Sequence, residues 1–299
     1  VAPLLMDYAK TYLQIVGGCC LLNALTPIFS SYLRAFGHTR QPLIATLSAN
    51  VLNLLLNAFF LFVVHWGVAG VALATVISRL VNLIIVMLCS RILIHAKERP
   101  ERISNREILL QILRVGIPSA LETAIYNIAM TITIRFLNTM DENGVNVTAR
   151  AYAMQITNFS YCIGAALAQA NAIMTGWRIG AHDYDACDKG TKKAALIGVV
   201  VAALLETTFA LCAEPIMRLF TDDPAMISLV GKLLAIDIAL EIGRVTNLVF
   251  VQALKTSGDA VFPSIMATCF MFLCNVGGTY FFGIHLGLLA VGAYIGMAS

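Results

Sequence analysis

Three ionisable residues lie on one predicted helical face in the apolar segment 225–255. Asp237, Glu241 and Arg244 are spaced by four and three residues, and residues at these spacings are neighbours on a helix. Charged side chains inside a membrane-spanning segment are costly, so they usually face the protein interior and mark ion pathways. A proton that binds Glu241 would release Arg244, which predicts a cation-dependent switch. The alternative is a static ion pair that holds this helix in its bundle; Asn247 extends the same polar face.

Glu122 is a second candidate for ion coupling. It follows Pro118 by four residues, near the start of the apolar segment 108–138, where an ionised carboxylate is unfavourable unless it faces a cavity. The alternative is an interfacial glutamate that caps or pairs at the start of the helix. We expect H+ or Na+ as the coupling ion, with no cofactor, no metal centre and no catalytic residue. The predicted coupling residues are Glu122, Asp237, Glu241 and Arg244.

Uncharged polar residues supply a candidate substrate cavity. In the segment 147–177, Gln155 and Asn158 are three residues apart and share a face, while Met154 offers adaptable apolar contact. Such groups can hydrogen-bond an organic substrate without requiring a particular charge. The alternative is that they join neighbouring helices, as polar residues in membrane proteins often do. The predicted cavity residues are Tyr126, Asn127, Met154, Gln155, Asn158 and Asn247.

The elements that position these residues are long apolar segments. The 299 residues are 59% hydrophobic and 12% charged, with a mean hydropathy of +0.81, which excludes a water-soluble globular domain. Segments of about 20 apolar residues can cross a bilayer as helices and are too long for the strands of a β-barrel. The net charge of +3 and the lack of a basic patch with interleaved aromatic residues argue against nucleic-acid binding. We expect an all-α integral membrane protein with about eight complete helices and a partial one: 10–36, 42–64, 68–94, 108–138, 147–177, 192–213, 225–255, 262–283 and a segment from 287.

Loop charges predict how the chain is oriented and divided. Lys and Arg accumulate in the connections after the first, third, fifth and seventh segments, whereas the alternate connections are mainly neutral or acidic. Because positive loops face the cytoplasm, we expect the chain to start on the outer side. The charged stretch 96–107 contains a proline and is the predicted cytoplasmic linker. It separates 1–95, the last three helices of one lobe, from 108–299, a second lobe truncated in its last helix.

An internal repeat supports the division into two lobes. Residues 32–42 align with residues 253–263 at a separation of 221, with matching Leu, basic, Gly and Pro positions. Both copies end on the predicted cytoplasmic side, so the repeat is parallel, as in some transporters. A repeat of this length holds six spans. We therefore expect two pseudo-symmetric bundles of six helices in the full protein, and a chain that is an internal fragment from the fourth helix to the start of the twelfth.

Six sequence segments occur in an order that is typical of one transporter family: YLRAFGHTRQP, NVLNLLLNAFFLF, WGVAGVALATVIS, GIPSALE, PIMRLFTDDP and EIGRVTNLVFVQALKTSGDAVFP. In these segments the chain resembles the bacterial branch of the multidrug and toxic compound extrusion (MATE) transporters. The resemblance implies two six-helix bundles around a V-shaped cavity, in a monomer of the cell membrane. It also implies exchange of inward-moving protons or sodium ions for small organic, often cationic, drugs. Better-known branches carry acids at the positions of Tyr126 and Arg244.

Two other classes of membrane protein are weaker alternatives. A lipid-linked oligosaccharide or polysaccharide flippase of the same broad superfamily would share the helix count and the repeat. Such a flippase needs a wider, more basic cavity for a pyrophosphate headgroup, and the predicted spans hold only Arg79, Arg135 and Arg244 as candidates. An enzyme is not expected, because the chain has no HExxH, GxSxG or P-loop motif.

Overall fold

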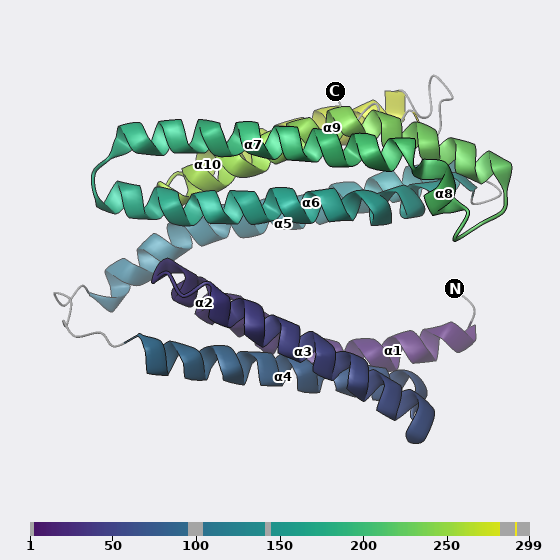
Figure 1. The fold of residues 1–299 in the computed structure, drawn as a ribbon, viewed down its shortest axis with the longest axis horizontal. Coiled ribbons are helices and arrows are strands. Elements are labelled where there is room, and N and C mark those ends of the chain that lie inside the picture. The colour runs from purple at the N-terminus through teal and green to yellow at the C-terminus, as the bar shows by residue number, and fades with distance from the viewer. Residues whose placement is uncertain (1–2, 95–103, 141–144, 282–290, 292–299) are drawn as a thin grey trace. The chain divides into compact units, whose positions relative to one another are not determined.

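The computed structural model describes residues 3–94, 104–140, 145–281 and 291, and the regular secondary structure of these parts is entirely helical (Figure 1). The chain divides into two compact units, Val1–Arg102 and Ile103–Ser299. The division falls within the predicted linker 96–107, of which 96–103 lie outside the described residues. That these units belong to the two lobes of a larger transporter stays a prediction.

The first unit packs three helical segments against α4. Leu33, Ala45 and Val86 are fully buried at the centre of this packing. The predicted segment 10–36 is broken at Cys19, where two helices meet at a bend of 44°, which the hydropathy pattern did not predict. The elements of this unit are α1 (Pro3–Gly18), α2 (Cys20–Ala35), α3 (Arg40–Ala58), the π-helical η1 (Phe59–Val63) and α4 (Gly67–Leu93).

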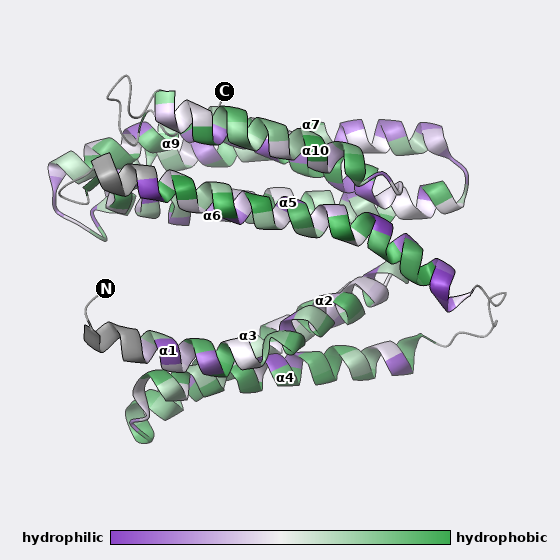
Figure 2. Ribbon diagram, turned by 180° about the vertical axis from the view of Figure 1, so that it is seen from behind, coloured by the Kyte–Doolittle hydropathy of each residue, from purple (hydrophilic) through white to green (hydrophobic). Residues whose placement is uncertain are grey.

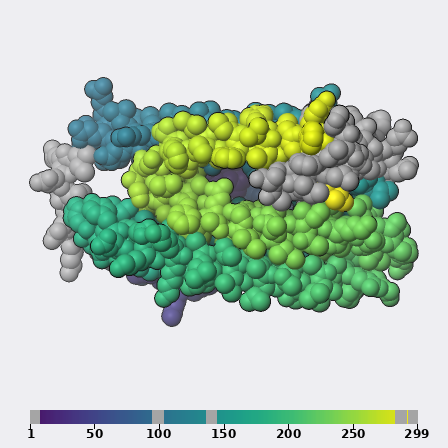
Figure 3. All heavy atoms as spheres, turned by 90° about the horizontal axis from the view of Figure 1, so that it is seen from above, coloured from purple at the N-terminus to yellow at the C-terminus, as the bar shows by residue number. Residues whose placement is uncertain are grey.

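The second unit is built around α9, which packs against both α6 and α7. α10 and η2 pack on α5. Figure 3 shows α9 lying between α7 and α10. The elements are α5 (Asn105–Met140), α6 (Val145–Gly180), α7 (Tyr184–Leu211), α8 (Ala213–Met217), α9 (Pro224–Thr256), α10 (Val261–Phe270) and the π-helical η2 (Met271–Gly277).

The helices match the predicted apolar segments. Five are long and apolar enough to cross a membrane, and the bent pair of α1 and α2 makes a sixth candidate. α6 and α9, of 36 and 33 residues, occupy the predicted segments 147–177 and 225–255 and carry most of the buried polar residues of their unit. Figure 2 shows hydrophobic residues along most of α4 and α10, and hydrophilic ones near the α6–α7 turn. The expected all-α membrane architecture is therefore confirmed, and the short helix α8 is an addition to it.

Two glycine turns repeat the same local geometry 221 residues apart. Gly37 and Gly258 have φ values of +81° and +93°, in the left-handed region that favours glycine. The Gly37 amide donates to the Arg34 carbonyl at 3.0 Å, and the Gly258 amide donates to the Lys255 carbonyl at 3.1 Å. Each turn ends one helix and leads into the next. The local structure therefore agrees with the parallel repeat predicted from the sequence.

Candidate functional site

Three buried carboxylates meet between α7 and α9. Glu206 on α7 and Asp237 and Glu241 on α9 each offer a carboxylate oxygen, and these oxygens lie within 4.8 Å of one another. The three side chains are at most 1% exposed. We call these three residues, together with Arg244, the carboxylate cluster. An isolated buried charge is strongly unfavourable, so such a cluster requires positive charge from the protein or from a bound ion.

Close packing of three helices brings the cluster together. An added Cβ on Gly164 of α6 or Gly198 of α7 would lie 2.7 or 2.6 Å from a methyl group of Val245 on α9. Both positions therefore require glycine for α6 and α7 to approach α9 this closely. Glu206 follows Gly198 by eight residues, about two helical turns, and so remains on the face of α7 directed at α9. The two glycines thus determine the helix spacing that places the carboxylates side by side.

Arg244 supplies positive charge to the cluster. Its Nη1 lies 2.7 Å from Glu241 Oε2, and its Nη2 lies 3.9 Å from Asp237 Oδ1. The Arg244 side chain is 32% exposed, in contrast to the carboxylates. With all groups ionised, the cluster carries three negative charges and one positive charge. Both oxygens of Glu206 and the second oxygen of Asp237 are buried without a hydrogen-bond partner among the described residues.

A buried hydroxyl borders the cluster from α6. Ser160 is fully buried, and it lies near enough to Glu206 to affect its electrostatics. Its hydroxyl lies beside the Glu206 carboxylate and so adds a neutral oxygen atom at the edge of the cluster. Oxygen atoms of this kind are the ligands that hard cations prefer. The cluster can therefore bind a proton on a carboxylate, or a small cation between its oxygens.

Glu122 lies at a different place from the other predicted coupling residues. Its Oε2 accepts a hydrogen bond of 2.6 Å from Ser264 of α10 and pairs with Lys255 Nζ at 2.9 Å. Lys255 follows Glu241 by 14 residues, about 21 Å along α9. The structure therefore brings Asp237, Glu241 and Arg244 together but not Glu122. The contacts of Glu122 match the paired interfacial glutamate that was its alternative interpretation, and its role in coupling stays a prediction.

The predicted cavity residues lie on exposed faces of the second unit. Tyr126 and Asn127 are on α5, where the Asn127 amide donates to the Thr123 carbonyl of its own helix at 2.8 Å. The remaining four are exposed on two helices: Met154, Gln155 and Asn158 on α6 and Asn247 on α9. They are accessible within their unit, which a substrate-lining role requires. That role itself stays a prediction.

Glu206 is the member of the cluster that sequence reasoning did not place. It has no charged neighbour at helical spacing, because the residues around it, from Leu196 to Leu204 and from Phe209 to Leu211, are apolar. The available signal was a lone carboxylate within an apolar segment, which by itself indicates an interior position. Its partners are on another helix, so only the packing identifies them.

Comparison with known proteins identifies the family. The MatE family model matches residues 2–59 and 118–281, which is most of the chain. The chain belongs to the MATE family. Members of this family are transporters and not enzymes, and they are multi-pass proteins of the plasma membrane, in agreement with the long apolar helices found here.

Two bacterial proteins are among the relatives of this MATE chain. The "Uncharacterized transporter YisQ" of Bacillus subtilis is 33% identical over 297 residues, covering 97% of the chain and 65% of the relative. The "Probable multidrug resistance protein NorM" of Thermotoga maritima is 24% identical over 306 residues, covering 97% of the chain and 63% of the relative. The chain thus spans slightly less than two thirds of these relatives.

Solved structures of the family share the fold. An outward-facing multidrug resistance MATE transporter of the MOP superfamily matches with a TM-score of 0.87 at 21% identity, covering 98% of the chain and 66% of that structure. A structure of MATE in complex with MaD3S matches with a TM-score of 0.85 at 22% identity, covering all of the chain and 67% of that structure. At this identity the match establishes the fold alone.

Proposed function

We propose that the transporter to which this chain belongs exports organic, often cationic, molecules in exchange for protons or sodium ions, and that the carboxylate cluster is its coupling site in the second unit. The supporting observation is the meeting of three buried carboxylates with one arginine. Multidrug resistance relatives support the choice of an organic substrate.

Electrostatics explains why a cation would bind. Each charge removed from water loses several kcal/mol of hydration, and opposite charge compensates for this only at close range. One arginine compensates one carboxylate, so the fully ionised cluster keeps two negative charges without partners. A proton or a sodium ion would reduce this imbalance. In this proposal the coupling ion is a transported substrate and not a resident cofactor.

Arg244 would convert binding into conformational change. A proton on Glu241, or a cation between the carboxylates, weakens the 2.7 Å contact between Glu241 and Arg244. The partly exposed guanidinium is then able to take another partner. A ligand shifts a conformational equilibrium only when it binds one state more strongly than the other. The proposal requires that the state which releases substrate outside is the state in which the cluster is neutralised.

Exposed polar groups on neighbouring helices would contact the substrate. Gln155 and Asn158 on α6 and Asn247 on α9 offer amide donors and acceptors that suit organic molecules of varied charge. Met154 adds an adaptable apolar contact. In this arrangement the exposed amides bind the substrate, whereas the buried carboxylates bind the coupling ion.

Efflux measured under separate ion gradients tests the proposal. The transporter is reconstituted in liposomes, and extrusion of a fluorescent cationic dye is driven by a proton gradient or by a sodium gradient. Glu206→Gln and Glu241→Gln should each lower gradient-driven efflux by about tenfold or more, within the range of typical coupling free energies. Asp188→Asn, at an exposed carboxylate outside the cluster, is the matched control. Efflux by both cluster variants at the wild-type rate under both gradients would overturn the assignment.

A further inference from the structure

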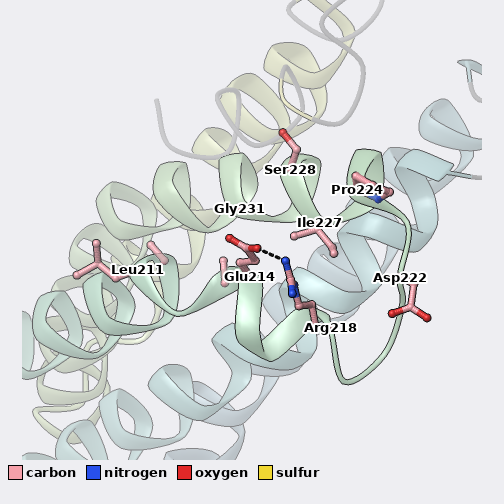
Figure 4. A pocket seen from close by; sticks show the side chains of 10 residues that line it. Leu211, Glu214, Arg218, Asp222, Pro224, Ile227, Ser228 and Gly231 are labelled. Carbon is pink, nitrogen blue, oxygen red and sulfur yellow. Dashed lines mark hydrogen bonds and ion pairs between the residues drawn. The ribbon is translucent and has the colours of Figure 1, made fainter.

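A groove opens at the end of the second unit, where α7 ends and α9 begins (Figure 4). Its volume is about 570 Å³, and its lining reaches from the loop at this end inward to Ala210 of α7 and Gly231 of α9, which lie four residues from Glu206 and six from Asp237. The loop charges place this end on the predicted outer side of the membrane. The charged residues that line the groove are Glu214, Arg218 and Asp222.

The short helix α8 and the residue that caps its C-terminus place two charges at the groove, Glu214 in the helix and Arg218 at the cap. Ala213 and Met217 are buried in the core formed by α6 and α9, so the opposite face of α8 must point outward. On that face Arg218 Nη2 lies 2.6 Å from Glu214 Oε1, and the two side chains are 67% and 64% exposed. Figure 4 shows these two side chains directed at each other beside the groove. The buried pair thus anchors the charged pair in a defined position.

Exposed apolar residues flank the charges on the same segment. Leu211 precedes α8, and Leu219 and Phe220 follow it, and all three side chains are largely exposed. Large exposed apolar side chains at the end of a membrane helix face lipid chains near the headgroup region. The groove therefore combines charges of both signs with an apolar border, which fits an amphipathic molecule that lies in the bilayer.

We propose that this groove binds the headgroup of a phospholipid that carries a phosphate and a primary ammonium group, the chemistry of phosphatidylethanolamine. Arg218 would bind the phosphate, because a guanidinium matches phosphate oxygens with two parallel hydrogen bonds. Glu214 would accept a hydrogen bond from the ammonium group, and Asp222, on the loop beyond Arg218, would add negative charge to the groove. The acyl chains would lie against Leu211 and Phe220.

The charges of the groove discriminate between headgroups. One arginine and two carboxylates give a net charge of −1, which disfavours anionic lipids such as phosphatidylglycerol. A choline group has no N–H and cannot donate hydrogen bonds to the carboxylates. The existing pair of Glu214 and Arg218 is solvent-exposed, and such pairs contribute only about 0.2–1 kcal/mol. Exchanging that pair for two headgroup contacts therefore costs little.

Lipid retention tests this inference independently of transport. The full chain is purified in detergent, stripped of lipid, and titrated with phosphatidylethanolamine, phosphatidylcholine or phosphatidylglycerol, and the bound lipid is counted by native mass spectrometry. Wild-type protein should retain phosphatidylethanolamine in preference to the other two. Arg218→Gln should lower that retention by about fivefold, the scale of one exposed charge interaction.

A matched control separates this site from nonspecific lipid contact. Lys192 and Asp188 form a similar exposed i,i+4 pair at the opposite end of α7, with a distance of 2.7 Å. Lys192→Gln should leave phosphatidylethanolamine retention unchanged. Equal retention of the three lipids by wild-type protein would overturn the inference. Equal loss in the Arg218 and Lys192 variants, or no loss in either, would overturn it as well.

Discussion

Replacement of Arg244 by glutamine perturbs the charge balance of the carboxylate cluster directly. The change leaves Glu241 and Asp237 without the guanidinium that now lies 2.7 and 3.9 Å from them. Removing one member of a buried ion pair typically costs about 3–5 kcal/mol, because the other charge remains buried and unpaired. The Arg244 side chain is 32% exposed, so water compensates for part of the loss. We therefore expect Arg244→Gln to lower the free energy of unfolding by about 3 kcal/mol.

A second substitution distinguishes lost charge balance from lost packing. The double variant with Glu241→Gln and Arg244→Gln removes one negative and one positive charge, so the net charge of the cluster is unchanged. If the uncompensated carboxylate causes the loss, the double variant should recover about half of it or more. If the arginine stem is what matters, the second change should recover nothing. The two explanations thus differ in whether the changes in the free energy of unfolding caused by the two substitutions add.

Thermal unfolding of the purified protein in detergent measures these effects. A loss of about 3 kcal/mol corresponds to a decrease in Tm of about 5 °C in a chain of 299 residues. Lys192→Gln, at an exposed pair on α7, is the control and should change the Tm by less than about 2 °C. Wild-type stability of Arg244→Gln, or a double variant no more stable than the single one, would refute the electrostatic reasoning.

Two further substitutions test helix packing in the second unit by the same thermal assay. Gly198→Ala should lower the free energy of unfolding by about 1–3 kcal/mol, because the added Cβ would lie 2.6 Å from Val245 Cγ1. Adding Val245→Ala should recover part of this loss. Strictly additive effects of the two substitutions would contradict the contact. Thr133→Val should lower the free energy of unfolding by about 1–3 kcal/mol, because the buried Asn275 Oδ1 loses its 2.8 Å hydrogen bond from the Thr133 hydroxyl. Unchanged stability would show that this bond does not stabilise the unit. The matched controls, expected to be nearly neutral, are Gly243→Ala and Thr131→Val.

Hydropathy and glycine spacing predicted most of the helical architecture. Apolar length determines where a helix can cross a bilayer, so the predicted segments match the observed helices closely. The repeat aligned Gly37 with Gly258, and their positive φ explains why both copies carry glycine there, because the left-handed region favours this residue. The break at Cys19 was not predictable in this way. Hydropathy alone does not indicate it, but Gly17 and Gly18, which have low helix propensity, directly precede the break.

Residues on one helix were easier to group than residues on different helices. The four- and three-residue spacings placed Asp237, Glu241 and Arg244 together, and the structure shows the two ion pairs that result. Glu122 was grouped with them by chemistry alone, and the structure places it beside Lys255, near the far end of the same helix α9. Shared chemistry does not establish proximity when two positions differ in depth along the membrane.

The position of Glu206 depends on a packing relation that charge patterns do not contain. Gly198 and Gly164 both contact Val245, so α6 and α7 approach α9 closely at that one position. Once the contact is known, the eight residues from Gly198 to Glu206 and the four from Glu241 to Val245 determine which carboxylates can meet. The glycine contact and the cluster are therefore parts of one arrangement. A change that widens the helix spacing at Val245 should also separate Glu206 from Asp237 and Glu241, and so weaken the proposed cation binding without altering any charge.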